Sequence, residues 1–152
     1  MLLPSNRNGQ PPKHVVIMGC GRIGASIAKS LADQGCTIAI LDLNPHAFER
    51  LSSDVVSEGR IKPITGDGTL EYDLHKASIA DADVFIAVSD RDTRNALAAH
   101  IAQQIFEIPT VISRMNDPHR KELYNQLGII TISGTTLMTE MMLEAVHRLE
   151  VA

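Results

Sequence analysis

The sequence has few aromatic residues and no excess of basic ones. Tryptophan is absent, and only three Phe and two Tyr occur in 152 residues. Proteins that bind single-stranded nucleic acid combine a basic groove with stacking aromatics. Here 14 basic residues stand against 18 acidic ones, which gives a net charge of −4. We therefore expect no nucleic-acid partner.

Long apolar runs and a cysteine framework are also lacking. The longest apolar runs are four or five residues, as in 84–88, whereas a membrane-spanning helix needs about 20. Two cysteines, Cys20 and Cys36, are too few for a disulfide framework or a zinc knuckle. The six histidines show no paired metal-ligand spacing. We expect a cytoplasmic protein with no metal site and no direct membrane insertion.

The chain alternates short apolar runs with helical patterns. Residues 1–13 are polar and rich in Pro, Asn and Gly, which predicts a flexible leader before a single domain over 14–152. The expected strands are 15–18, 37–41, 60–65, 83–88, 110–113 and 129–132. The expected helices are 22–34, one that begins at Pro45, 93–106, 118–127 and 135–149. Apolar strands separated by helices predict an α/β Rossmann-type, doubly wound, six-stranded parallel sheet in the order 3-2-1-4-5-6.

A G-x-G-x-x-G pattern lies between the first expected strand and the first expected helix. It consists of Gly19, Cys20, Gly21, Arg22, Ile23 and Gly24. In such a loop the first glycine permits a tight turn, the second lets the backbone approach a pyrophosphate, and the third lets the helix pack on the strand. The helix N-terminus offers free N–H groups to the phosphates. The pattern predicts nucleotide binding, and a glycine-rich turn without a ligand is the alternative.

Polar residues after the second strand complete this prediction. Asp42 lies 18 residues beyond Gly24, close to the spacing of about 20 at which an acid binds the ribose hydroxyls. A carboxylate there favours NAD or another adenosine nucleotide over NADP, with a capping or solvent-facing role as the alternative. Leu43 and Asn44 follow on the same ribose edge. Arg22 suggests extra phosphate charge or a contact with a neighbouring subunit, against the simpler possibility of an exposed first-turn arginine.

Three further segments reach the same edge of the predicted sheet. The turn after the third strand is Gly66, Asp67, Gly68 and Thr69, where Asp67 is a candidate acceptor for an adenine amino group. Thr69 is expected to cap the next short helix, and a pure capping turn is the alternative. Ser89 follows the fourth strand, Asn95 lies in the first turn of the next helix, and Arg114 ends the fifth strand.

These motifs together resemble the TrkA-N family, also called RCK for regulator of potassium conductance. That family combines a G-x-G-R-x-G loop, an acid ending the second strand, a G-D-x-T turn after the third and an Asp-x-x-Asn segment after the fourth. The corresponding residues are the glycine loop, Asp42, 66–69 and 92–95, together with Arg114. The resemblance covers about residues 14–149, and it departs from the family in having Gly68 where Ala is common.

The resemblance implies a nucleotide-binding regulatory module rather than an enzyme. Family members sense NAD(H), AMP, ADP or ATP, form homodimers or rings of dimers, and lie at the inner face of the membrane through an integral potassium channel or transporter subunit. By this resemblance the glycine loop and Arg22 hold phosphates, Asp42 the ribose, and 67–69 the adenosine end. Arg114 would lie near the phosphates or the neighbouring subunit. The family's small C-terminal lobe is absent, so the chain is either a one-domain member or a piece of a longer one.

The sequence leaves open an enzymatic alternative, the role of Cys20 and the packing partner of the last helix. A small NAD-dependent oxidoreductase would use the same fold, and Cys20 is either a loop filler or a redox-active thiol with a pKa lowered by the helix N-terminus. The last helix carries a wide apolar stripe of Leu137, Met138, Met141, Met142, Ala145, Val146 and Leu149. This stripe either docks on its own sheet or packs on a second copy, and the resemblance favours the homodimer.

Overall fold

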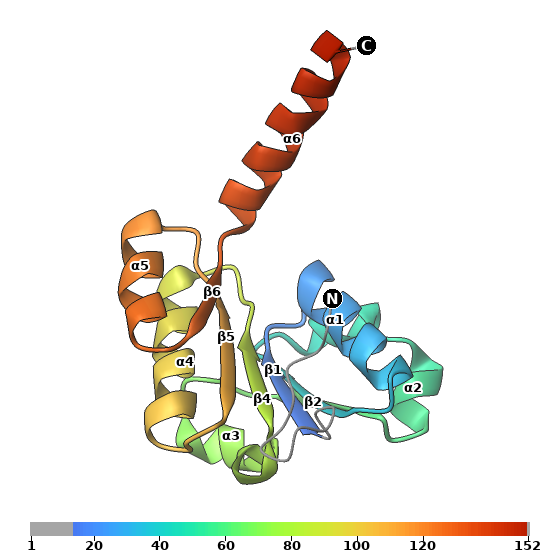
Figure 1. Cartoon of the computed structure of the whole chain (residues 1–152). Coiled ribbons are helices and arrows are strands. Elements are labelled where there is room, and N and C mark those ends of the chain that lie inside the picture. Colours follow the sequence, from blue (N-terminus) through green and yellow to red (C-terminus); the bar gives the residue numbers. More distant parts are fainter. Residues whose placement is uncertain (1–13, 152) are drawn as a thin grey trace.

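The computed structural model describes residues 14–151, and its centre is one sheet of parallel strands (Figure 1). The strand order is β3-β2-β1-β4-β5-β6, which confirms the doubly wound topology. The strands are β1 (His14–Met18), β2 (Thr37–Asp42), β3 (Ile61–Thr65), β4 (Val84–Ala87), β5 (Thr110–Arg114) and β6 (Ile130–Ile132). The expected leader over 1–13 lies outside the described residues.

Helices cover both faces of this sheet, as a buried parallel sheet requires. The helical segments of the described chain are α1 (Arg22–Asp33), η1 (Pro45–Arg50), α2 (Ser53–Ser57), α3 (Glu71–Lys76), η2 (Ile79–Asp81), α4 (Asp92–Gln104) and α5 (Pro118–Gln126), followed by α6 (Gly134–Val151), which stands apart from the sheet. The helix expected at Pro45 is therefore two short pieces: the 3₁₀ segment η1 ends at Arg50 and α2 begins at Ser53.

Alternating residues of β1 separate two apolar cores. Val15 and Ile17 point into the core under α1, whereas Val16 and Met18 point into the core under α4. All four side chains are at most 3% exposed. Three alanines of α4, at positions 98, 99 and 102, are fully buried, so this helix packs closely on the sheet.

The strand register brings the candidate binding residues to one edge. Met18, the last residue of β1, pairs with Leu41 of β2 on one side and Ala87 of β4 on the other. The segments that follow these strands therefore begin side by side. The strand order reverses between β2 and β4, around β1, and ligands of such sheets bind at this point.

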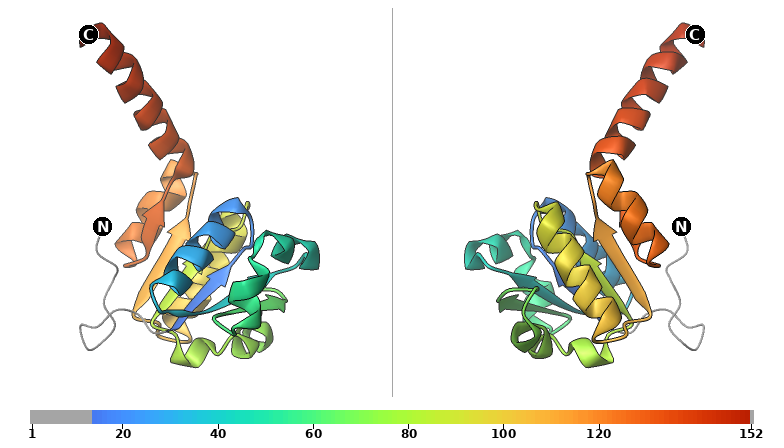
Figure 2. Two further views of the ribbon diagram at one scale, coloured as in Figure 1. Left: turned by 90° about the vertical axis from the view of Figure 1, so that its right-hand side faces the viewer. Right: turned by 90° about the vertical axis from the view of Figure 1, so that its left-hand side faces the viewer.

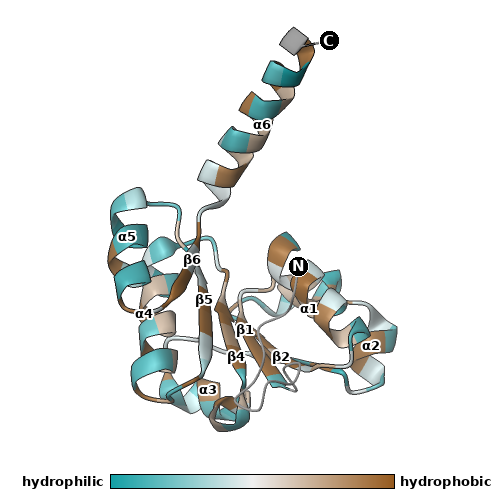
Figure 3. Ribbon diagram, in the orientation of Figure 1, coloured by the Kyte–Doolittle hydropathy of each residue, from teal (hydrophilic) through white to brown (hydrophobic). Residues whose placement is uncertain are grey.

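Helix α6 does not dock on its own sheet. It extends from the end of β6 away from the rest of the molecule (Figures 1 and 2). Its apolar side chains are 49–79% exposed: Leu137, Met138, Met141, Met142, Leu143, Val146 and Leu149. Figure 3 shows apolar and polar positions alternating along this isolated helix. Of the two sequence-based alternatives, docking on its own sheet is wrong.

Candidate functional site

A cleft of about 510 Å³ opens at the carboxyl ends of the central strands. Twelve of the sixteen predicted site residues line it: Gly19, Cys20, Gly21, Arg22, Ile23, Asp42, Leu43, Asn44, Gly66, Gly68, Ser89 and Arg114. The four that do not are Gly24, Asp67, Thr69 and Asn95. The cleft also includes Arg50 and Arg94, which the sequence analysis did not single out.

The glycines of the loop after β1 differ in what surrounds them. Gly19 has φ +110°, and a Cβ there would lie 2.9 Å from the backbone nitrogen of Ser89. A Cβ on Gly24 would overlap the carbonyl oxygen of Gly19, so α1 can approach β1 only without a side chain there. At Gly21 nothing lies within 4 Å of a Cβ position. The first and third glycines are therefore needed for packing, whereas the second leaves open space at the cleft.

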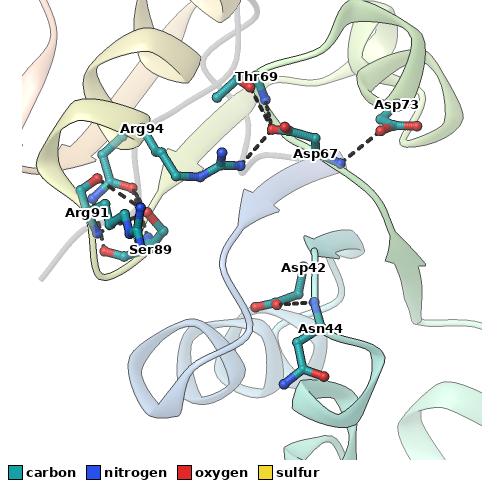
Figure 4. Close-up of polar contacts among 9 residues, drawn as sticks. Asp42, Asn44, Asp67, Thr69, Asp73, Ser89, Arg91 and Arg94 are labelled. Atoms are coloured by element: carbon teal, nitrogen blue, oxygen red, sulfur yellow. Dashed lines mark hydrogen bonds and ion pairs between the residues drawn. The ribbon is translucent and has the colours of Figure 1, made fainter.

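Asp42 joins the glycine loop to the turn after β2. Its Oδ2 accepts a hydrogen bond from the Cys20 backbone N–H at 2.8 Å. Its Oδ1 accepts one from the Asn44 N–H at 2.8 Å (Figure 4). The Asn44 side chain in turn accepts from the His46 N–H at 3.1 Å and caps η1. Each carboxylate oxygen retains acceptor capacity. The carboxylate thus organises the turn and still lines the cleft with acceptor capacity to spare.

Cys20 contributes its backbone rather than a reactive thiol. Its side chain is fully buried, and Sγ lies 3.5 Å from the carbonyl oxygen of Ala47. Burial, followed by the negative charge of Asp42, raises the pKa of this thiol to about 11. Of the two alternatives drawn from the sequence, the structure favours the loop filler, because burial disfavours the charged thiolate.

Asp67 forms an ion pair with Arg94, which lines the cleft. Its Oδ1 accepts from the Thr69 N–H at 2.9 Å, from the Thr69 hydroxyl at 2.6 Å and from Arg94 Nη2 at 2.6 Å (Figure 4). Burial alone would raise the pKa of Asp67, but these hydrogen bonds and the charge of Arg94 lower it. The carboxylate therefore stays ionised and orients Arg94 at the cleft.

Thr69 does not cap the following helix, contrary to the sequence-based expectation. The N-cap of α3 is Leu70, which makes no side-chain cap. The Thr69 hydroxyl is instead bonded to Asp67, two residues earlier. Thr69 lies one residue before the N-cap position of α3, and its hydroxyl donates a charge-assisted hydrogen bond to the Asp67 carboxylate.

Asn95 lies behind the cleft wall rather than in it, which corrects its assignment as a ligand-contacting residue. Its side chain is fully buried. Oδ1 accepts from the Ser89 N–H at 2.9 Å and from the Ser89 hydroxyl at 2.7 Å. Nδ2 donates to the carbonyl oxygens of Ser89 at 3.0 Å and Arg114 at 3.1 Å. Asn95 thereby fixes the ends of β4 and β5 relative to each other.

Four arginines line the cleft, and three have no acidic partner. Arg94 pairs with Asp67 at 2.6 Å. Within residues 14–151, Arg22, Arg50 and Arg114 make no ion pair. The Nε of Arg114 is buried and lacks a hydrogen-bond partner. A buried unpaired donor is uncommon and calls for an explanation; an anion in the cleft would provide its acceptor.

Two searches of the described part of the chain were negative. Over residues 14–151, no group of three or more His, Cys, Asp or Glu side chains is placed to hold a metal ion. No helix in the same range is long and apolar enough to span a membrane.

The sheet order, the glycine loop and the acid after β2 define a Rossmann-type nucleotide-binding fold. The chain belongs to the TrkA-N family, whose model, described as the TrkA-N domain, matches residues 15–134. This confirms the family resemblance drawn from the motifs.

Comparisons with individual proteins agree with this assignment. The Trk system potassium uptake protein TrkA of Streptomyces coelicolor is 39% identical over 130 residues, covering 86% of this chain and 56% of that protein. This chain thus spans about half the length of that relative. The TrkA-N domain of the inner membrane protein ybaL of Escherichia coli superposes with a TM-score of 0.75 at 15% identity, covering 88% and 96% of the two chains. The Shewanella denitrificans Kef CTD in AMP bound form gives 0.73 at 24% identity, covering 90% and 82%.

Proposed function

We propose that the cleft binds an adenine nucleotide, either NAD(H) or one of AMP, ADP and ATP. The observation that carries the proposal is a cleft at the strand-order reversal with an open glycine edge, the Asp42 carboxylate and three arginines that form no ion pair within residues 14–151. One neighbour of the same fold was solved with AMP, which supports the choice of adenosine ligands.

In this proposal each part of the ligand meets a different element. The phosphates lie over Gly21 and the N-terminus of α1, where free N–H groups and the helix dipole favour anions. Arg22 and Arg114 supply charge-assisted donors to them. The ribose hydroxyls donate to Asp42, and the base lies toward the turn at 66–68.

We propose regulation rather than catalysis. The described residues that line the cleft include no His, Lys or Tyr, the side chains that most often exchange a proton in hydride-transfer enzymes. A ligand regulates only when its affinity differs between two arrangements of the protein. The name of the Streptomyces relative supports a role in potassium uptake, with this domain at the cytoplasmic face of the membrane, bound to an integral channel or transporter subunit.

We further propose that α6 joins two copies of the chain. Its exposed apolar stripe includes three methionines, at positions 138, 141 and 142, and methionine suits an adaptable interface. Light scattering during size exclusion at micromolar concentration should give twice the chain mass. The double variant Met138→Glu/Met142→Glu should be monomeric, whereas Glu140→Gln/Glu144→Gln on the polar face should remain dimeric. A monomeric unmodified chain would contradict the proposal.

Calorimetric titration of the chain with AMP, ADP, ATP, NAD+, NADH and NADP+ tests the nucleotide site. We expect binding of one or more ligands that lack a 2′-phosphate and no detectable binding of NADP+, because Asp42 repels a 2′-phosphate. Arg114→Met should weaken binding by about 10- to 100-fold, since a hydrogen bond to a charged group contributes roughly 1.5–3 kcal/mol. Absence of binding by all six ligands would refute the proposed function.

A further inference from the structure

A hydrogen-bonded connection joins the cleft to the base of α6. The Asn116 side-chain oxygen accepts from the Gly134 N–H at 3.1 Å and from the Thr135 N–H at 3.5 Å. These are the first two residues of α6. The Ser133 hydroxyl accepts from the Thr136 N–H at 3.1 Å. Two side chains thus cap the N-terminal turn of α6: Ser133, which directly precedes the helix, and Asn116 in the loop after β5.

The loop that carries Asn116 is itself held by α4. The two carboxylate oxygens of Asp92 accept from the Asn116 N–H at 3.1 Å and from the Asp117 N–H at 2.8 Å. The N–H of Met115, which is fully buried, donates to the Ile132 carbonyl at the end of β6 at 2.9 Å. Each backbone N–H of residues 115–117 therefore has a partner on α4 or at the end of β6.

The cleft end of this segment is Arg114, two residues before Asn116. Asn95 holds the Arg114 carbonyl, and the side chain reaches the cleft with its buried, unpaired Nε. An anion bound there would supply the missing acceptor and draw the guanidinium toward it. Such a shift would reach the oxygen that caps α6 through residues 114–116.

We propose that Asn116 is a positioning residue that couples occupancy of the cleft to the orientation of α6. This inference rests on the proposed nucleotide binding and names how it would be transmitted. Helix α6 stands away from the sheet (Figure 2) and is joined to it through β6 and the cap at 133–135. A shift at the cap therefore changes the direction of the whole helix. Asn116 itself does not line the cleft, so its loss should leave nucleotide affinity unchanged.

Pulsed electron spin resonance measures this coupling directly. Labels are placed on Ser30→Cys in α1 and Glu140→Cys in α6, both exposed positions; the native Cys20 and Cys36 are buried and stay unlabelled. Dilution with unlabelled chain limits the signal to pairs within one chain. Saturating ADP should shift the main distance by more than about 2 Å, the scale of helix shifts in known allosteric proteins.

Asn116→Ala should bind ADP with a Kd within about twofold of the unmodified chain and lose the distance shift. Asn125→Ala is the matched control: its side-chain oxygen likewise accepts from a backbone N–H, that of Thr131 at 3.2 Å, but on β6 rather than α6. This control should keep the shift. Gly134→Pro removes one of the two capping donors at a position where proline suits a helix start. It should reduce the shift even if Asn116→Ala does not fold.

The failures of the two proposals are distinguishable. If the unmodified chain binds ADP without a distance shift, the coupling is refuted and the nucleotide site stands. A shift that survives in both Asn116→Ala and Gly134→Pro refutes the role of Asn116, as does loss of the shift in the Asn125→Ala control. A chain that binds none of ADP, AMP and NAD+ refutes both proposals together.

Discussion

The Asp42 carboxylate provides the sharpest test of how the cleft holds a nucleotide. In the structure its two oxygens accept backbone N–H groups at 2.8 Å from Cys20 and Asn44, and in the proposed complex they also accept the two ribose hydroxyls. Hydrogen bonds to a charged group contribute about 1.5–3 kcal/mol each. Asp42→Ala should therefore weaken ADP binding by about 3 kcal/mol or more, roughly 150-fold in Kd.

A control must separate hydrogen bonding from charge. Asp42→Ala also removes a negative charge from a cleft that binds an anion, which by itself would strengthen binding. Asp90 lines the same cleft and is exposed, so Asp90→Ala makes the same change in charge without removing a ribose acceptor. It should bind ADP as tightly as the unmodified chain or more tightly.

Calorimetry with ADP measures both variants, and circular dichroism establishes that they are folded. Removal of the carboxylate should also reduce the discrimination between NAD+ and NADP+, because its repulsion of the 2′-phosphate is lost. If Asp42→Ala binds ADP within twofold of the unmodified chain, the ribose is not held by this carboxylate and the reasoning fails.

Three further predictions concern the loop, the thiol and an acid. Gly21→Ala should keep its melting temperature and lose ADP affinity. Gly24→Ala should lower the melting temperature strongly, because a Cβ at Gly24 meets the Gly19 backbone whereas one at Gly21 meets nothing. Calorimetric scans measure the melting temperatures and titrations measure the affinities. With a pKa of about 11, the Cys20 thiol should not react with a maleimide at pH 8 in the folded chain, and rapid labelling there would contradict its burial. Because the pKa of Asp67 is lowered in the folded chain, its carboxylate stabilises the fold above the unfolded pKa of about 4, and this stabilisation is lost as the pH falls further, so Asp67→Asn should be less stable than the unmodified chain at pH 7. Urea unfolding should show that deficit shrinking below about pH 4, and a constant deficit would contradict it.

The sequence predicted the sheet and most of the cleft because both rest on local patterns. Apolar strands between helices determine a doubly wound sheet, and the register of β1 then places Gly19 beside the ends of β2 and β4. The G-x-G-x-x-G spacing and the acid after β2 carry the same geometry in many proteins. These elements could therefore be predicted without knowing any long-range side-chain contact.

The side-chain surroundings that the sequence did not reveal depend on contacts between distant segments. The thiol of Cys20 is desolvated by packing that includes Ala47, which spacing does not reveal. Asp67 is engaged by Arg94, 27 residues later, and Asn95 turns into the interior to join two strands. The capping preference of threonine is an average tendency, and here Thr69 lies one residue before the N-cap of α3.

The free helix and the missed arginines have a similar explanation. An apolar stripe indicates that a helix face packs against something, but it does not distinguish the helix's own sheet from another molecule. The position of α6 therefore follows only from the structure. Arg50 lies at the end of a 3₁₀ segment that was expected to be helical, and its approach to the cleft depends on that turn. No pattern in the sequence marks it as part of the site.

The most direct test of the central claim is to observe where a nucleotide binds. Proton–nitrogen correlation spectra of the chain titrated with ADP report on each backbone N–H separately. The account predicts saturable shifts at Gly21, Arg22 and Asn44, with little change along the outer surface of α5. Shifts concentrated at the second pocket, which Leu97 and His100 of α4 line together with Leu123 of α5, or no saturable shifts at all, would contradict nucleotide binding in the cleft.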